Sequence, residues 1–173
     1  YDDFSHAPED RHYLGNGIPK WYAGFNNTFR YKKIDLTVNM RGAFNFQIIN
    51  EGRMNFEGTQ NGYRDNRLTS VNDKIFGKTT LSPEVQAEYN SYYVEDGDYW
   101  KIDNIALGYT IDNFKTETIK SLRVYGSVNN AFTITGYKGI NPEVRTSGLS
   151  PGIDRREQFP TVRTFTLGLS ARF

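Results

Sequence analysis

Residues 34–48 read IDLTVNMRGAFNFQI, an alternation of apolar and polar side chains over fifteen positions. The even positions carry apolar residues or glycine, and the odd positions are polar except for Ala43. A period of two is typical of a β-strand whose two faces meet different surroundings. At ~3.3 Å per residue the stretch extends about 50 Å, whereas most strands have about five or six residues. The pattern therefore predicts an unusually long strand.

The preceding residues 21–31 alternate in the same way and predict the first strand of a hairpin. Lys32-Lys33 then forms a two-residue turn, although it lacks the Asn-Gly or Gly residues that such turns favour. Pairing across this turn places Phe29 opposite Leu36, Phe25 opposite Met40, and Trp21 opposite Phe44. The apolar faces of the two strands then lie on one side of the hairpin, which supports this register.

Three more alternating stretches, at 99–111, 122–134 and 162–173, predict three further strands. The predicted fold class is therefore all-β, an antiparallel up-and-down meander. The connections alternate between short and long, as in transmembrane barrels with short periplasmic turns and long extracellular loops. We expect outer loops at 50–98 and 135–160, periplasmic turns at 32–33 and 112–121, and a helical turn that begins near Ser82.

Alternation alone leaves two interpretations open, because the apolar face can form a soluble core or face lipid. Long strands, polar residues on the opposite face and aromatic residues near the strand ends favour lipid. Trp21 and Phe44 form one aromatic level, and Tyr31 and Phe173 lie toward the other. Five strands cannot close a barrel, so this interpretation requires further strands elsewhere. The main alternative is a soluble β-sandwich that binds glycans, and an enzyme domain ranks third.

The composition of the 173 residues excludes several classes of protein. A formal net charge of +1 and the lack of any Lys/Arg-rich run argue against a nucleic-acid partner. The chain has no Cys, which excludes disulfides, Cys-ligated zinc and thiol nucleophiles. We find no nucleophile elbow, phosphate loop or HExxH motif, and Asp35 and Asp103 have no evident partner. We expect no enzyme activity, no cofactor and no metal, and we interpret Asp96-Gly97-Asp98 as a turn.

Four stretches resemble one known family. They are VEDGDYWKIDNIALGYT at 94–110, LRVYGSVNNAF at 122–132, YKGINPE at 137–143 and RTFTLGLSARF at 163–173. They are similar, in this order, to the end of the SusC/RagA family of TonB-dependent outer-membrane transporters, and 21–50 is similar to the preceding hairpin. Asn141, Phe159 and Trp100 depart from the family's usual residues.

The resemblance implies a 22-stranded barrel filled by an N-terminal plug domain, of which this chain holds about the last five strands. Barrels of this size have a plugged lumen. The plug and its TonB box are absent from the chain. The family imports oligosaccharides or peptides across the outer membrane of Bacteroidota. The implied partners are a SusD-like lipoprotein lid, the TonB complex, the remaining barrel and plug, and the barrel-assembly machinery, in a dimer of transporter–lipoprotein pairs.

Two sets of residues are candidates for contacts with these partners. The resemblance implies a barrel-assembly signal in the closing strand, at Phe165, Leu167, Leu169 and Phe173. The long outer loop carries aromatic and Arg side chains, which suit sugar surfaces or the lid protein. These loop residues are Phe56, Tyr63, Arg64, Arg67, Tyr89, Tyr92 and Tyr93.

Overall fold

The computed structural model describes residues 11–57, 66–75, 77–80, 89–112, 118–155 and 159–173. Five strands form one antiparallel sheet in the order β1-β2-β5-β6-β8. Their bounds are β1 Trp21–Tyr31, β2 Ile34–Phe44, β5 Tyr99–Ile111, β6 Ser121–Thr135 and β8 Thr164–Arg172. Consecutive long strands are neighbours, so the sheet is an up-and-down meander, as the alternation predicted. In the described residues no helix has both the length and the hydropathy needed to cross a membrane.

The β1–β2 hairpin has the register that the sequence predicted. Phe29 pairs with Leu36, Phe25 with Met40, and Trp21 with Phe44. Lys32 in the two-residue turn has a φ of 52°, a left-handed backbone conformation that tight hairpin turns require. A left-handed lysine costs some free energy, which the eleven residue pairs of the hairpin offset.

The predicted strand over 34–48 is interrupted, which corrects the sequence interpretation. β2 ends at Phe44, and a separate strand β3, Gln47–Asn50, follows. Asn45 between them has a φ of 62°, and its backbone N–H donates to Asp98 Oδ1 at 2.6 Å. This left-handed residue turns the chain out of the long sheet. Phe46 and Ile48, which we had assigned to the lipid-facing side, are fully buried beyond the bend.

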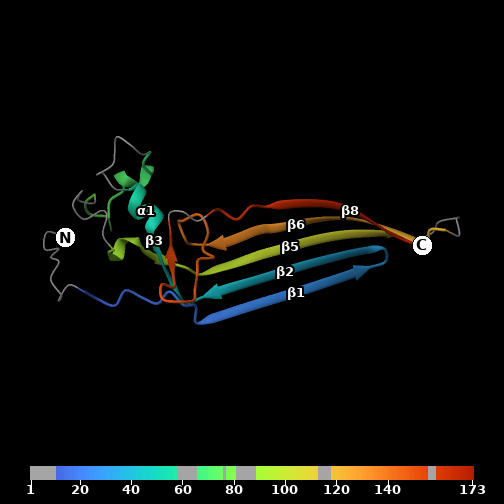
Figure 1. Cartoon of the computed structure of the whole chain (residues 1–173), viewed down its shortest axis with the longest axis horizontal. Helices are drawn as coiled ribbons and strands as arrows, with labels where there is room; N and C mark the ends of the chain where they lie inside the picture. Colours follow the sequence, from blue (N-terminus) through green and yellow to red (C-terminus); the bar gives the residue numbers. More distant parts are fainter. Residues whose placement is uncertain (1–10, 58–65, 76, 81–88, 113–117, 156–158) are drawn as a thin grey trace.

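A second, smaller part of the molecule lies at one end of the long sheet (Figure 1). We call it the outer module, residues 45–57, 66–75, 89–98 and 136–155. It contains a three-stranded sheet in the order β4-β3-β7 and three short helices. The bounds are β4 Val94–Asp96, β7 Ile153–Asp154, α1 Glu51–Phe56, η2 Thr69–Asn72 and η3 Ser91–Tyr93. The expected outer loops 50–98 and 135–160 thus contain regular structure, while the helical turn expected at Ser82 falls outside the described residues.

The main buried cluster of apolar side chains lies where the long sheet meets the outer module. Its members come from β2, β5 and the module, and are Ala43, Phe46, Ile48, Tyr99, Tyr137 and Val144. In the described part of the chain, β1, β6 and β8 contribute no buried apolar side chain. The core therefore anchors the module to one end of the sheet and leaves most of the sheet uncovered.

Candidate functional site

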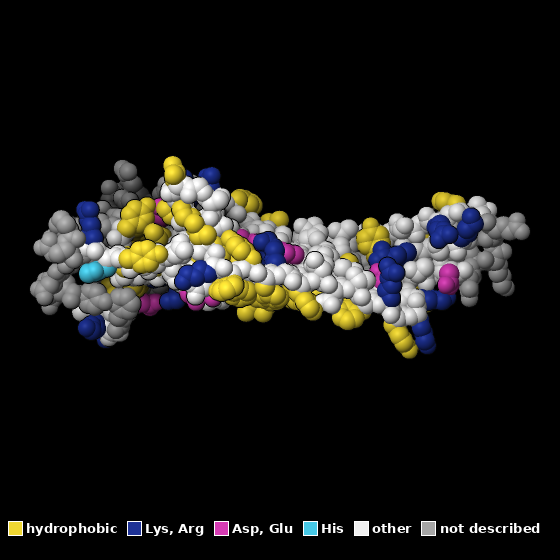
Figure 2. Space-filling view, turned by 90° about the horizontal axis from the view of Figure 1, so that it is seen from below, with side chains coloured by type: hydrophobic (Ala, Val, Ile, Leu, Met, Phe, Trp, Pro, Cys, Tyr) yellow, Lys and Arg dark blue, Asp and Glu magenta, His cyan; other side chains and the backbone are white. Residues whose placement is uncertain are grey.

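The apolar face of the long sheet is open to its surroundings. Phe25 is 52% exposed and Leu167 is 90% exposed, and neither packs into a protein core. Figure 2 shows hydrophobic side chains gathered along one side of the strands. A soluble sandwich would bury these side chains against a second sheet, and the described residues supply none over this face. This face therefore needs an apolar environment that the chain itself does not provide.

Aromatic side chains mark two levels on the apolar face. At the end near the outer module lie Trp21, Phe44 and Trp100, and Phe44 stacks on Trp100 with 6.1 Å between ring centroids. At the opposite end lie Tyr31 and Tyr109, which the register places on either side of Ile34. Ten residues separate Trp21 from Tyr31, which at ~3.3 Å per residue and about 40° of tilt gives about 25 Å. This is the height of the apolar band of transmembrane barrels.

The polar face carries an inner ion pair, Asp35–Arg123, which spans three strands. The Arg123 guanidinium on β6 donates to both oxygens of Asp35 on β2, with Nε 2.9 Å from Oδ1. It crosses over Gly108 of β5, where an added Cβ would lie 2.4 Å from Arg123 Nη2. Tyr125 likewise lies over Gly168, on the next strand. Two glycines thus allow long side chains to lie flat across the sheet.

A second group, the outer charge cluster, lies near the other end of the polar face and comprises Arg41, Lys101, Asp103 and Glu143. Arg41 Nε donates to Asp103 Oδ2 at 2.7 Å, and Glu143 accepts from both Arg41 and Lys101. A bulge in the β2–β5 pairing next to Asp103 directs this side chain toward Arg41. Through these bonds Glu143 attaches the loop that follows β6 to strands β2 and β5. Asp35 and Asp103 are therefore each paired with an arginine.

Inside the outer module, Arg53 is the centre of a buried polar network. Its Nε donates to Glu57 Oε1 at 2.8 Å, and its Nη1 donates to Glu95. The guanidinium also stacks on the Tyr92 ring, 4.7 Å from its centroid. Burial by itself lowers the pKa of Arg53, but the hydrogen bonds to Glu57 and Glu95 raise the pKa overall. A fully paired network of this kind fixes the geometry of the module.

Tyr137 connects the YKGINPE stretch to the same module. Its hydroxyl donates to Asp154 Oδ2 at 2.5 Å, and both side chains are buried. Burial raises the pKa of the Asp154 carboxyl, although the hydrogen bond from Tyr137 opposes this shift. Burial and the bond to Asp154 both raise the pKa of the Tyr137 hydroxyl. Tyr137 and Glu143 thus attach one loop to two different parts of the structure.

The structure separates the predicted loop residues into different roles. Tyr63 and Arg64 lie outside the described residues. Tyr89 is 61% exposed and donates to Glu51 Oε1 at 2.6 Å, and Phe56 and Arg67 are also exposed. Tyr92 is partly buried beside Arg53. Tyr93 is fully buried within the module.

The four residues of the proposed assembly signal lie at the open edge of the sheet. Phe165, Leu167 and Leu169 project from β8 on the apolar face, and they and Phe173 are well exposed. β8 pairs with β6 on one side, and no described strand pairs with its other edge. An edge strand with exposed backbone groups can add to another sheet.

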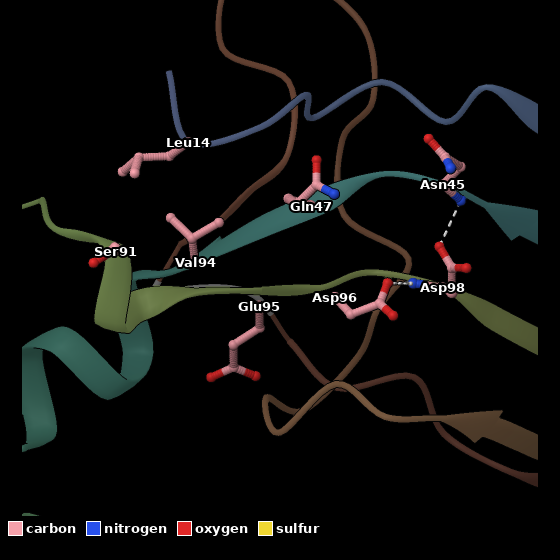
Figure 3. A pocket seen from close by; sticks show the side chains of 8 residues that line it. All are labelled: Leu14, Asn45, Gln47, Ser91, Val94, Glu95, Asp96 and Asp98. Atoms are coloured by element: carbon pink, nitrogen blue, oxygen red, sulfur yellow. Dashed lines mark hydrogen bonds between the residues drawn. The ribbon is translucent and has the colours of Figure 1, made fainter. Parts of the chain in front are cut away.

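A hollow of about 420 Å³ lies between the chain near Leu14 and strands β3 and β4 (Figure 3). Asp96 and Asp98 line it, but each carboxylate already accepts a backbone hydrogen bond, as expected of a turn. No group of three or more His, Cys, Asp or Glu that could hold a metal ion occurs in the described ranges. The hollow supports no catalytic assignment.

Sequence reasoning missed the paired charges on the polar face and in the module. The alternation places Arg41 and Asp35 on the polar face of a predicted strand. Their partners Glu143 and Arg123 are more than 80 residues away in the chain. The separation along the sequence hid these contacts. Arg53 and Glu57, spaced four apart, carried a local helix signal that we did not use.

An apolar face between two aromatic levels, opposite a polar face with paired charges, defines this chain as a piece of transmembrane β-barrel wall. No family model matches the chain, but individual known proteins do, and they agree with this class. The chain is 30% identical over 177 residues to TonB-dependent receptor P3 of Formosa agariphila, covering 95% of this chain and 17% of that protein. It is 32% identical over 161 residues to TonB-dependent receptor SusC of Bacteroides thetaiotaomicron, covering 87% of this chain and 15% of that protein.

Solved structures show the same fold. The RagAB peptide importer in its closed-closed state superposes with a TM-score of 0.74 at 20% identity, over 90% of this chain and 17% of the importer chain. Over most of its length the chain is similar to TonB-dependent receptors, SusC among them, and it shares its fold with the RagAB importer chain, in agreement with the resemblance found in its sequence. It spans about a sixth of the length of the curated relatives it matches. These relatives are named as receptors or importers, not as enzymes.

Proposed function

We propose that this chain forms the closing strands of the barrel of a SusC-like importer in a bacterial outer membrane. The observation that carries the proposal is the exposed apolar face, bounded by two aromatic levels about 25 Å apart and backed by a polar face. In the proposed protein the apolar face contacts lipid, and the polar face lines the lumen of a barrel of 22 strands. A plug domain fills this lumen, and the TonB complex supplies energy through the plug.

The outer module is the proposed contact region for a SusD-like lipoprotein lid and for incoming oligosaccharides or peptides. It lies beyond the aromatic level of Trp21, on the side that carries the long connections. Tyr89 and Arg67 are exposed there, and Tyr63 and Arg64 stay candidates from the sequence. Exposed apolar side chains at Ile140, Leu149 and Phe159 support a protein partner in this region. We propose a dimer of transporter–lipoprotein pairs as the assembled form.

The exposed edge of β8, with Phe165, Leu167, Leu169 and Phe173, supports recognition by the barrel-assembly machinery. Replacing Phe173 and Leu169 with Ser in the full-length protein should lower the amount of folded barrel in the outer membrane. The matched control replaces Thr166 and Ser170, on the polar face of the same strand, with Ala. Equal assembly of both variants would leave these residues with a packing role only.

The transport function is tested by uptake in cells that carry the full-length protein. Deletion of the gene should abolish uptake of one class of oligosaccharide or peptide, and a protonophore should have the same effect because the energy comes through TonB. Recovery of the full-length protein in a soluble fraction contradicts the proposal.

The soluble alternative is tested with the 173-residue chain alone. Without detergent we expect it to aggregate, since its apolar face has no cover. A monomer that unfolds cooperatively in water would favour the glycan-binding β-sandwich.

A further inference from the structure

Four asparagines form a row across the polar face of the long sheet. In the register of the sheet, Asn26 on β1 pairs with Asn39 on β2, Asn39 pairs with Asn104 on β5, and Asn104 pairs with Asn129 on β6. Asn104 Nδ2 donates to Asn129 Oδ1 at 2.8 Å. Thr164 on β8 continues the row at the same level. We call these five residues the amide row.

The amide row lies halfway along the sheet. Asn26 is five residues from Trp21 and five from Tyr31, the two aromatic levels of β1. The next level toward the inner end is also uncharged, with Thr28 and Thr37 hydroxyls 3.4 Å apart. The row is therefore distant from the outer module, where a soluble ligand arrives.

On either side of the row, the side chains of the outer charge cluster and of the inner ion pair bond to one another within the wall. In the outer charge cluster, Glu143 and Asp103 pair with the two cations, and Lys101 is only 3% exposed. In the inner ion pair, Arg123 bonds to Asp35 over Gly108. In contrast, the side-chain amides of Asn26 and Asn39 have no hydrogen-bond partner among the described residues, and Asn26 and Asn129 are exposed. The amide row thus carries hydrogen-bonding groups that the wall itself does not use.

We infer that the amide row is the line along which the wall binds an uncharged stretch of polypeptide inside the barrel, namely the backbone of the plug. A primary amide offers a carbonyl acceptor and two N–H donors, so it matches the donor and acceptor of a peptide group. Adjacent amides stand about 4.8 Å apart, the spacing between neighbouring strands. This inference rests on the proposed function, since only a closed barrel encloses a plug.

The chemistry of the row also suits a contact that must be released. A neutral hydrogen bond between protein groups has a small net free energy because water replaces it when it breaks. A salt bridge with a partner inside the lumen would leave a buried charge behind when the partner leaves. At the levels next to the row, Arg41 pairs with Asp103 and Arg123 pairs with Asp35, and the exchangeable neutral groups of the row face the partner. The plug can therefore separate from this level without uncovering an unpaired charge.

Cross-linking tests which partner touches the row. The chain contains no Cys, so a single Asn39→Cys in the full-length transporter, made free of other reactive thiols, can carry a benzophenone probe in outer-membrane vesicles. We expect cross-links to plug peptides. The neighbouring Val38→Cys, on the apolar face, is the matched control and should cross-link to lipid. Cross-links from Asn39→Cys to an added oligosaccharide, or to no polypeptide, overturn the inference.

The control separates this inference from the proposed function. If Val38→Cys labels lipid and the cells still take up substrate, the barrel assignment stands whatever Asn39→Cys shows. If Val38→Cys cross-links to protein instead of lipid, the proposed function itself fails.

A second measurement uses plug release, seen as channel opening in planar bilayers at moderate urea. The variant Asn26→Ala/Asn39→Ala/Asn129→Ala should open at least about tenfold more often than the wild type, because several neutral hydrogen bonds are lost. The control Thr28→Ala/Thr37→Ala removes two hydroxyls that bond to each other and should leave the opening frequency unchanged. Equal opening frequencies of the triple variant and the wild type, with a normal amount of barrel, overturn the inference.

Discussion

The long sheet and the outer module belong to one chain but are stabilised in different ways. In the module, Phe46, Ile48 and Tyr93 are fully buried, and Arg53 pairs with two carboxylates inside it. In the sheet, large apolar side chains such as Phe25, Phe29 and Leu167 are exposed. The module is stabilised by its own core, as soluble proteins are. The sheet is stabilised by backbone pairing and by a surrounding apolar solvent, which in our proposal is lipid.

A single residue, Asn45, separates the exposed sheet from the buried module. The alternation of residues 34–48 does not change at Asn45, yet Met40 and Phe44 lie on the open face while Phe46 and Ile48 enter a core. One left-handed residue is enough to redirect the face. Mutations on either side of the bend should therefore differ in kind, and four predictions use this difference.

The largest expected effect is in the core of the module. Phe46→Ala should destabilise the module by about 3–5 kcal/mol, because it removes a fully buried ring and leaves a cavity. Phe25→Ala, the matched control on the open face, should cost much less, because lipid refills the space. Hydrogen exchange of the outer module in the full-length protein measures the local loss. Similar losses for both variants would mean that Phe25 also lies in a protein core.

The next prediction concerns how the cost of an arginine on the open face depends on its depth in the proposed membrane. Val38→Arg, level with the amide row, should destabilise the barrel by about 2–4 kcal/mol, and Leu36→Arg, nearer the inner aromatic level, by less. Thr37→Arg, between them on the polar face, should cost much less, because its side chain points away from lipid. Urea unfolding of the full-length protein in lipid vesicles measures all three. A loss that does not depend on depth or on face would argue against a lipid-facing surface.

A smaller effect concerns Tyr137 and pH. The raised pKa of Asp154 means that the folded module binds its proton more tightly than the unfolded chain does. The module is therefore most stable below the ordinary value of 3.8 and loses stability as pH rises through the raised pKa. Tyr137→Phe removes the donor that stabilises the carboxylate, so it should cost about 1–3 kcal/mol at neutral pH.

In acid the same variant should cost less, because the protonated Asp154 carboxyl no longer needs a donor for its charge. Thermal unfolding of the module at several pH values measures this. Tyr89→Phe, which removes an exposed hydroxyl that bonds to Glu51, is the control and should change stability little at any pH. A pH-independent loss for Tyr137→Phe would contradict the role given to Asp154.

The smallest effect concerns two glycines on the polar face. Gly108→Ala should destabilise the barrel by about 1–2 kcal/mol, because its Cβ would lie 2.4 Å from Arg123 Nη2 and 2.6 Å from Asp35 Oδ1 and displace the inner ion pair. Gly24→Ala, with no atom within 4 Å of the added Cβ, should be neutral or stabilising by up to about 1 kcal/mol. Urea unfolding compares the two variants. Equal effects would show that the space over Gly108 is not used.

Much of the sheet could be predicted from local pattern. The bounds of β1 and β5, and the register of the β1–β2 hairpin, follow from the alternation and from a two-residue turn. The candidate site was harder to predict. The aromatic residues of the long loop looked alike in sequence, yet Tyr89 is exposed and Tyr93 is fully buried. Tyr89 bonds to Glu51, whereas the Arg53 guanidinium lies over the Tyr93 ring, and no local pattern encodes this difference.

The sequence by itself determined that a long strand has one apolar and one polar face, because side chains alternate along every extended chain. It could not determine where that face turns inward at Asn45, or that Arg123 reaches Asp35 and Glu143 reaches Arg41. Those contacts join residues that are distant in the chain, and they form only when the folded sheet brings neighbouring strands within hydrogen-bonding distance. The alternation of side chains is a local property, whereas the pairing of charges depends on the whole fold.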